Sequence, residues 1–432
     1  MYKNAGEILF RKDFPGVFAF EKMAREGLSA GNRALSLQRI VFFPIPWYNE
    51  TIIYKQRGVS AMRPLQLLIK PSSANCNLNC KYCFYCDEGN KRETFSYGFM
   101  NEETLEVLVK KAFDYADGYC GFAFQGGEPT LVGLPFFERL MELERRYNTK
   151  NIPVDNSIQT NGYRLSEEWG EFFRRENFLV GLSLDGIKST HDAYRVNKKG
   201  EGSFGEIMKT AEMFNRLGVE YNILTVVNGK TGLRAAKIYD FYKKNGFGYL
   251  QFIACLDPVG EEPGKRDYSL TPEIYGRFLI DLFDRWYEDV KTGSQPYIRQ
   301  FENVVGMVAG CEPESCEQRG ICSVQNVIEA DGSVYPCDFY ALDEYRLGNV
   351  HTHDFYELRS NPVTERFVRD SAESLEDCRN CRFFAICRGG CRRNRVTLAG
   401  GERKNYFCPA YRMFYEATIE RFRELAGRYL TR

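Results

Sequence analysis

The stretch "LQLLIKPSSANCNLNCKYCFYC" (residues 65–86) decides the fold, because it joins a strand-like apolar run to a group of cysteines. Three of them, Cys76, Cys80 and Cys83, can hold three corners of a 4Fe–4S cluster and leave the fourth iron open. Catalytic metal sites keep such an open position. A closed zinc site is the alternative, with Cys86 as its fourth ligand.

Strand-like and helical patterns alternate for about two hundred residues after this stretch. Six runs have the length and composition of strands: residues 65–70, 121–125, 154–160, 178–184, 221–227 and 249–255. Amphipathic helices are predicted at 101–118, 166–176, 205–218, 233–246 and 272–291. This order indicates an α/β fold with parallel βα units, in an open sheet or a barrel. Functional groups are then expected in the loops after the carboxyl ends of the strands.

The composition narrows the class of protein. The chain has 432 residues, with 58 Lys plus Arg and 58 Asp plus Glu, so its zero net charge gives no general attraction to nucleic acid or anionic membranes. No apolar run reaches the roughly 20 residues of a membrane span, and the N-terminus lacks a signal peptide. We therefore predict a cytoplasmic protein whose 15 cysteines are thiols or metal ligands.

A second cysteine group lies near the C-terminus, before a last helix predicted at about 409–428. Its spacing is Cys316-x5-Cys322-x14-Cys337, followed by Cys378-x2-Cys381-x5-Cys387-x3-Cys391-x16-Cys408. Eight cysteines are the number that two fully ligated 4Fe–4S clusters require. Two structural zinc sites with four cysteines each remain the alternative.

The motif Cys76-x3-Cys80-x2-Cys83 after a first strand resembles the radical S-adenosylmethionine (radical SAM) superfamily. The stretches "FQGGEPTL" (124–131) and "SLDG" (183–186) fit the same resemblance. It implies a partial (β/α)6 TIM-like barrel whose open iron binds the amino and carboxylate groups of S-adenosylmethionine. The C-terminal group resembles the SPASM extension of such enzymes. That implies one auxiliary cluster on Cys316, Cys322, Cys337 and Cys391, and another on Cys378, Cys381, Cys387 and Cys408.

Together with the motifs above, the stretches "IQTNG" (158–162), "LQFIACLDP" (250–258) and "DGSVYPCDFY" (331–340) closely resemble anaerobic sulfatase-maturating enzymes, which convert a sulfatase cysteine or serine to Cα-formylglycine. The resemblance extends from Met62 to the last helix. The resemblance implies Asp338 as general base, with Tyr85 and Gln125 touching the substrate. It also implies a set of cofactor-binding residues: Tyr82, Gly126, Gly127, Glu128, Ser183, Arg195 and Leu256. The expected cofactors are S-adenosylmethionine and three 4Fe–4S clusters. The expected partners are an unfolded or nascent sulfatase and an external low-potential electron donor of the flavodoxin or ferredoxin type, with no nucleic acid and no membrane.

Two other functions stay open at this point. One is another SPASM peptide maturase that forms thioethers or epimers in ribosomal peptides, and the other is a non-catalytic iron–sulfur or zinc scaffold. The residues do not separate cysteine from serine substrates.

The expected domains are the barrel at 62–300, the SPASM domain at 301–408 and a C-terminal helix at 409–432. Residues 1–61 are an extension without a motif, and we hypothesise that the natural start is Met62. Cys86 and Cys311 have no assigned role, and little effect is expected from replacing Cys86.

Overall fold

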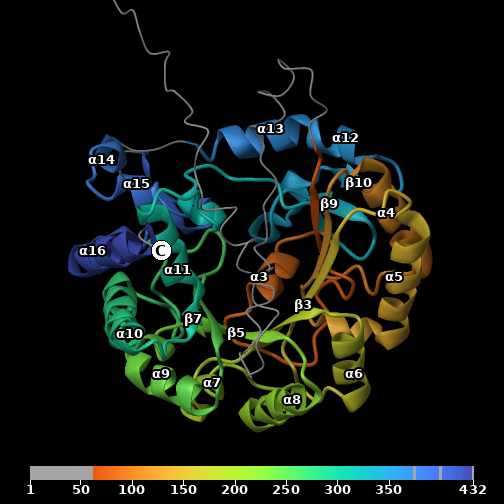
Figure 1. Cartoon of the computed structure of the whole chain (residues 1–432). Coiled ribbons are helices and arrows are strands. Elements are labelled where there is room, and N and C mark those ends of the chain that lie inside the picture. Colours follow the sequence, from red (N-terminus) through yellow and green to blue (C-terminus); the bar gives the residue numbers. More distant parts are fainter. Residues whose placement is uncertain (1–61, 373–375, 398–400, 431–432) are drawn as a thin grey trace, which may run out of the picture. The chain divides into compact units, whose positions relative to one another are not determined.

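A computed structural model describes residues 62–372, 376–397 and 401–430 (Figure 1). The predictions made for residues 1–61 lie outside the described residues. Among the helices described, none combines the length and the apolar character needed to cross a membrane.

Six parallel strands form the centre of the sheet, in the order β1 to β6. They are β1 (Leu65–Ile69), β2 (Cys120–Phe124), β3 (Val154–Thr160), β4 (Leu179–Ser183), β5 (Tyr221–Val227) and β6 (Tyr249–Ala254). Every predicted strand is present, with ends within one residue of the prediction. A short seventh strand, β7 (Tyr297–Ile298), pairs with β6 and was not predicted. The α/β prediction is confirmed, and the parallel sheet with its outer helices is consistent with a partial TIM-like barrel.

Most helices lie around this sheet, and the first one, residues 84–90, lies near the middle of the view (Figure 1). The helices of this region are α3 (Phe84–Asn90), α4 (Glu102–Tyr115), α5 (Leu134–Tyr147), α6 (Glu167–Arg175), α7 (Lys188–His191), α8 (Phe204–Leu217), α9 (Ala235–Lys244), α10 (Pro272–Thr292) and α11 (Arg299–Val308). The predicted Asn101 cap of α4 is present, since its side chain accepts a hydrogen bond from the Thr104 N–H. Helix α5 was missed, although Phe137, Leu140 and Leu143 form a buried face of the kind that predicts a helix.

The C-terminal region continues the same sheet on the β1 side. Strand β8 (Val327–Ile328) runs parallel to β1, with Leu68 opposite Val327, and β9 (Ser333–Tyr335) and β10 (Gly348–Asn349) follow in antiparallel order. The short 3₁₀ turn Asp338–Tyr340 follows β9 after two intervening residues, Pro336 and Cys337. This pairing brings Asp338 to the carboxyl ends of β1 and β2, where a barrel carries its functional groups.

Smaller elements complete the C-terminal region: α12 (Phe355–Arg359), α13 (Pro362–Arg369), α14 (Glu376–Arg379), α15 (Phe384–Cys387), the hairpin β11 (Arg395–Thr397) with β12 (Arg403–Asn405), and α16 (Cys408–Leu430). Helix α16 packs along α10 and α11. Aromatic contacts fix this packing, with the rings of Phe283 and Phe422 4.5 Å apart.

Candidate active site

Cys76, Cys80 and Cys83 lie in the segment that joins β1 to α3. Burial raises the pKa of the Cys76 and Cys80 thiols to about 12, and the charge of Cys83 adds to both shifts. The pKa of Cys83 is lowered instead, first by a hydrogen bond from the Cys86 thiol and then by backbone N–H groups at the start of α3. Buried thiols that disfavour one another's ionisation suit a metal cluster, which binds them as thiolates. The donor set therefore fits the predicted open cluster.

Cys86 lies beside these three thiols. Its pKa is raised, first by the hydrogen bond it donates to Cys83 and then by burial and by the charges of Cys83, Cys76 and Cys80. The cysteine that the sequence left without a role is thus in contact with a predicted ligand.

The Gly-Gly-Glu turn follows β2 and packs against the cysteine loop. Gly127 has a φ of +55°, and a Cβ there would lie 2.2 Å from the Asn75 carbonyl oxygen, so only glycine fits. The Glu128 N–H donates to the same carbonyl at 2.8 Å. The Glu128 carboxylate is buried and accepts from the Asn161 N–H at 2.8 Å and from the hydroxyls of Thr130 and Thr160. These hydrogen bonds connect the Gly-Gly-Glu turn to the end of β3.

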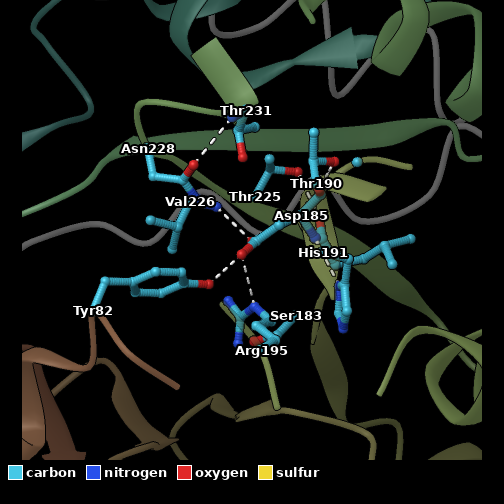
Figure 2. Close-up of polar contacts among 12 residues, drawn as sticks. Tyr82, Ser183, Asp185, Thr190, His191, Arg195, Thr225, Val226, Asn228 and Thr231 are labelled. Atoms are coloured by element: carbon cyan, nitrogen blue, oxygen red, sulfur yellow. Dashed lines mark hydrogen bonds and ion pairs between the residues drawn. The ribbon is translucent and has the colours of Figure 1, made fainter. Parts of the chain in front are cut away.

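A second group surrounds Asp185, just after β4 (Figure 2). One carboxylate oxygen of Asp185 accepts from the Tyr82 hydroxyl and from Arg195 Nε, the latter at 3.0 Å. Tyr82 comes from the cysteine loop, and the Arg195 guanidinium lies 5.6 Å from the centre of its ring. Ser183, at the end of β4, accepts from Gln159 Nε2 at 3.1 Å. The structure thus brings Tyr82 and Arg195 together, as the resemblance implies.

A third group surrounds Asp338. Its Oδ2 accepts from the Tyr85 hydroxyl at 2.8 Å and from Gln125 Nε2 at 2.7 Å. Burial raises the pKa of Asp338 to about 6, opposed by the charge of Lys70 and by these two hydrogen bonds. Its Oδ1 is buried and has no hydrogen-bond partner among the described residues. Three residues predicted from distant parts of the sequence therefore meet at one point.

A buried ion cluster beside Asp338 was missed by the sequence analysis. Glu329, between β8 and β9, is fully buried and forms ion pairs with Lys70, at 2.7 Å, and with Arg92. Lys70 comes from the end of β1, and its ammonium lies 4.9 Å from the centre of the Tyr85 ring. The cluster ties the first strand to the segment that carries Asp338. No sequence signal links residues more than 230 positions apart.

Two of the C-terminal cysteines, Cys337 and Cys387, have pKa values that respond to neighbouring cysteines. Burial raises the pKa of Cys337, and so do the charges of Cys391, Cys322 and Cys316. Burial likewise raises the pKa of Cys387 to about 12, and the charges of Cys408, Cys378 and Cys381 act in the same direction. The cysteines that affect Cys337 and those that affect Cys387 are therefore the other members of the set predicted for each.

No group of three or more His, Cys, Asp or Glu side chains in the described ranges is placed to hold a single metal ion. A 4Fe–4S cluster does not need such convergence, because its thiolates bind different irons.

Leu256, the last predicted cofactor residue, follows β6 at the edge of a cavity of about 480 Å³. The β11–β12 hairpin also lines this cavity, and Arg393, in the turn just before β11, donates to the Asp257 carbonyl at 2.6 Å. The neighbouring thiol, Cys255, has its pKa raised by burial and by the charges of Asp257 and Asp185. Leu256 therefore lies on the same side of the barrel as the Asp185 group.

Comparisons with known proteins identify the family. The model of the Radical SAM superfamily matches residues 71–242, and that of SPASM, an iron–sulfur cluster-binding domain, matches residues 320–382. A cysteine-type anaerobic sulfatase-maturating enzyme of Clostridium novyi is 47% identical over 84% of this chain and 98% of its own length. A serine-type enzyme of Bacteroides thetaiotaomicron is 33% identical over 82% of this chain and 89% of its own length.

Solved structures agree with this result. Native anSMEcpe with bound AdoMet and the Cp18Cys peptide is 45% identical, with a TM-score of 0.81 over 85% of this chain and 99% of that chain. The chain belongs to the anaerobic sulfatase-maturating enzymes, a family of radical SAM enzymes, and contains an iron–sulfur-binding SPASM domain.

Proposed function

We propose that this enzyme oxidises a cysteine of an unfolded or nascent sulfatase to Cα-formylglycine. The observation that carries the proposal is the meeting of Tyr85, Gln125 and Asp338 beside the cysteine loop. The choice of cysteine over serine is supported by the higher identity to a cysteine-type relative, 47% against 33% for a serine-type one. The peptide bound in the related structure supports a peptide substrate.

The residues proposed to hold the cofactor suit its groups. Three thiols, Cys76, Cys80 and Cys83, would hold a cluster with one open iron, and the Gly126–Gly127 turn offers close backbone approach. The remaining cofactor contacts would come from Tyr82, Glu128, Ser183, Arg195 and Leu256. When bound, S-adenosylmethionine supplies the 5′-deoxyadenosyl radical that removes one hydrogen atom from the substrate Cβ.

Asp338 then takes up the proton. After loss of the Cβ hydrogen, the substrate thiol must lose one proton and one electron to become a thioaldehyde, which water converts to the aldehyde. The free Oδ1 of Asp338 can accept that proton while Oδ2 stays bound to Tyr85 and Gln125. The hydrogen bonds from Tyr85 and Gln125 keep the carboxylate from rotating, so its position relative to the substrate is fixed.

Electron removal is assigned to the C-terminal clusters. We propose one 4Fe–4S cluster on the set that contains Cys337 and a second on the set that contains Cys387. With the cluster on Cys76, Cys80 and Cys83 this gives three clusters. An external flavodoxin or ferredoxin is proposed to reduce the cluster on Cys76, Cys80 and Cys83. Asp338 directly follows Cys337, so proton and electron would leave the substrate on the same side. The division into a barrel at 62–300, a SPASM domain at 301–408 and a last helix at 409–432 is part of this proposal.

The test is an anaerobic incubation of the reconstituted enzyme with S-adenosylmethionine, a reductant and two matched sulfatase peptides, one with cysteine and one with serine. Mass spectrometry should detect the aldehyde form of the cysteine peptide and much less of the serine form. An unchanged mass of both peptides, with 5′-deoxyadenosine still formed, would contradict the proposed substrate.

A further inference from the structure

Asp185 is fully buried, and all its polar atoms have partners within the chain (Figure 2). Oδ1 accepts from the Val226 N–H at 2.9 Å, and Oδ2 accepts from Tyr82 and Arg195. The backbone carbonyl accepts from the Thr190 hydroxyl at 2.6 Å. Because the side chain is fully buried and both oxygens already accept hydrogen bonds from the chain, neither oxygen is exposed to a ribose or any other ligand, and its function lies in the groups that it holds.

The partners of Asp185 come from separate segments of the barrel. Tyr82 belongs to the cysteine loop, Val226 to β5, and Thr190 to α7. A further contact comes from His191, whose buried ring accepts from the Asp185 N–H at 3.2 Å and contacts the Ser203 hydroxyl at 2.9 Å. These contacts fix both the backbone and the side chain of Asp185. The Asp185 carboxylate is therefore held in one position, and the side chains of Tyr82 and Arg195 are bound to it.

Arg195 uses only part of its guanidinium in this contact. Nε donates to Asp185, while the two terminal nitrogens have no hydrogen-bond or ion-pair partner among the described residues. The guanidinium lies 5.6 Å from the centre of the Tyr82 ring, and Tyr82 lies between Cys80 and Cys83 in the sequence, so Arg195 is close to the proposed open cluster. A planar guanidinium held at one nitrogen can still bind a carboxylate through others.

We propose that Asp185 is a positioning residue, which holds Arg195 ready for the carboxylate of S-adenosylmethionine and ties it to the cysteine loop through Tyr82. The proposal rests on the cofactor site described above but not on the identity of the peptide substrate. In this account Asp185 does not touch the cofactor. It fixes the direction of the arginine relative to the cluster, and it balances the buried positive charge when the cofactor is absent.

A double-mutant cycle on cofactor binding tests this. Asp185→Asn places an N–H₂ group where two donors now bind, so Arg195 should lose its fixed position. We expect the affinity for S-adenosylmethionine to fall about tenfold or more, as for the loss of a hydrogen bond to a charged group. Combined with Arg195→Lys, the loss should be no larger than that of Arg195→Lys alone, because Asp185 acts through Arg195.

The readouts are equilibrium binding of the cofactor to the anaerobic, cluster-loaded protein and the change in the electron paramagnetic resonance signal of the reduced cluster on cofactor addition. Glu144→Gln is the matched control, since Glu144 is also a buried carboxyl, bound to Asn156 at 3.1 Å on the β3 side of helix α5. It should bind the cofactor with unchanged affinity. Unchanged affinity in Asp185→Asn, or losses that add in the double variant, would overturn the proposal.

Tyr82→Phe keeps the test decisive if Asp185→Asn does not fold. It removes only the hydroxyl that binds Asp185 and keeps the ring on which Arg195 packs. We expect a few-fold loss of cofactor affinity, and no loss beyond that of Arg195→Lys when these two changes are combined. Unchanged affinity in Tyr82→Phe would contradict the link to the cysteine loop. A failed peptide reaction with intact cofactor binding would count against the proposed function and leave this inference standing.

Discussion

Two buried aspartates, Asp185 and Asp338, lie in different regions of the molecule and differ in one respect. Asp185, in the barrel, has both carboxylate oxygens bound by donors of the chain. Asp338, in the C-terminal region, has two donors on Oδ2, whereas none of the residues that the structure describes donates to its buried Oδ1. A buried oxygen without a partner costs free energy, and such sites persist where a substrate or water completes them.

The difference separates two roles. A carboxylate with no free oxygen can only hold its neighbours in place, whereas one with a free oxygen can accept a proton from a substrate. The comparison predicts that replacing Asp338 allows cofactor cleavage but stops the formation of product. Replacing Asp185 should instead weaken the binding of the cofactor, which precedes its cleavage.

The largest effect is expected from Cys80→Ala, which removes a ligand of the proposed open cluster and with it the chemistry that precedes both aspartates. No 5′-deoxyadenosine should form, and less iron should be bound per chain. Iron analysis and chromatography of the reaction mixture measure both quantities. Cys120→Ala is a suitable control, because this buried thiol in β2 belongs to none of the proposed sets. Cofactor cleavage by Cys80→Ala at the rate of that control would contradict the assignment.

Asp338→Asn should lower the rate of aldehyde formation by about 10² to 10⁴, the range that a general base contributes. The amide oxygen can still accept from Tyr85 and Gln125, so the site should keep its shape. Cofactor binding should therefore stay unchanged. The rate is measured by mass spectrometry of the peptide at saturating cofactor. Asp338→Glu serves as a second variant, since it keeps a carboxylate and should retain more activity than Asp338→Asn. Higher activity in Asp338→Asn than in Asp338→Glu would show that the shape of the side chain, and not its ability to accept a proton, determines the rate.

Lys70→Met should lower aldehyde formation by about tenfold, because it removes the cation that pairs with Glu329 and lies over the Tyr85 ring. Glu329 keeps Arg92 as a partner, so the loss of one of its two buried ion pairs should lower the free energy of unfolding by about 1.5–3 kcal/mol. Denaturant unfolding measures the second effect. Lys209→Met, which breaks an exposed pair with Glu206, should cost less than about 1 kcal/mol. Equal costs for the two variants would show that the buried cluster does not stabilise the site.

The smallest effect is expected from Cys86→Ala. It removes one hydrogen bond to the Cys83 thiol, worth about 0.5–1.5 kcal/mol, and no proposed ligand. Bound iron should stay at the wild-type level, and the rate of cofactor cleavage should change at most a few-fold. Loss of a full cluster in this variant would instead make Cys86 a ligand, as in the zinc alternative.

Much of the barrel could be predicted because strand ends depend on local pattern. The six predicted strands lie within one residue of β1 to β6. Tyr85, Gln125 and Asp338 were named from the family resemblance and not from local pattern, and the structure places them in contact. Helix α5 was not predicted, although the apolar spacing of Phe137, Leu140 and Leu143 is typical of an amphipathic helix.

Other features depend on packing that no local pattern encodes. The Lys70–Glu329–Arg92 cluster forms only because β8 pairs with β1. The engagement of Glu128 by Thr130, Thr160 and Asn161, and the enclosure of Asp185, likewise become visible only once the strands lie side by side.

The most direct test of the central claim is the ratio of aldehyde product to 5′-deoxyadenosine, measured in one anaerobic assay for the wild type, Asp338→Asn and Asp185→Asn. The account predicts a ratio far below that of the wild type for Asp338→Asn, because the cofactor is cleaved without product. It predicts a ratio close to that of the wild type for Asp185→Asn, with both products formed more slowly at low cofactor concentration. A wild-type ratio in Asp338→Asn would contradict the role of Asp338 as the proton acceptor.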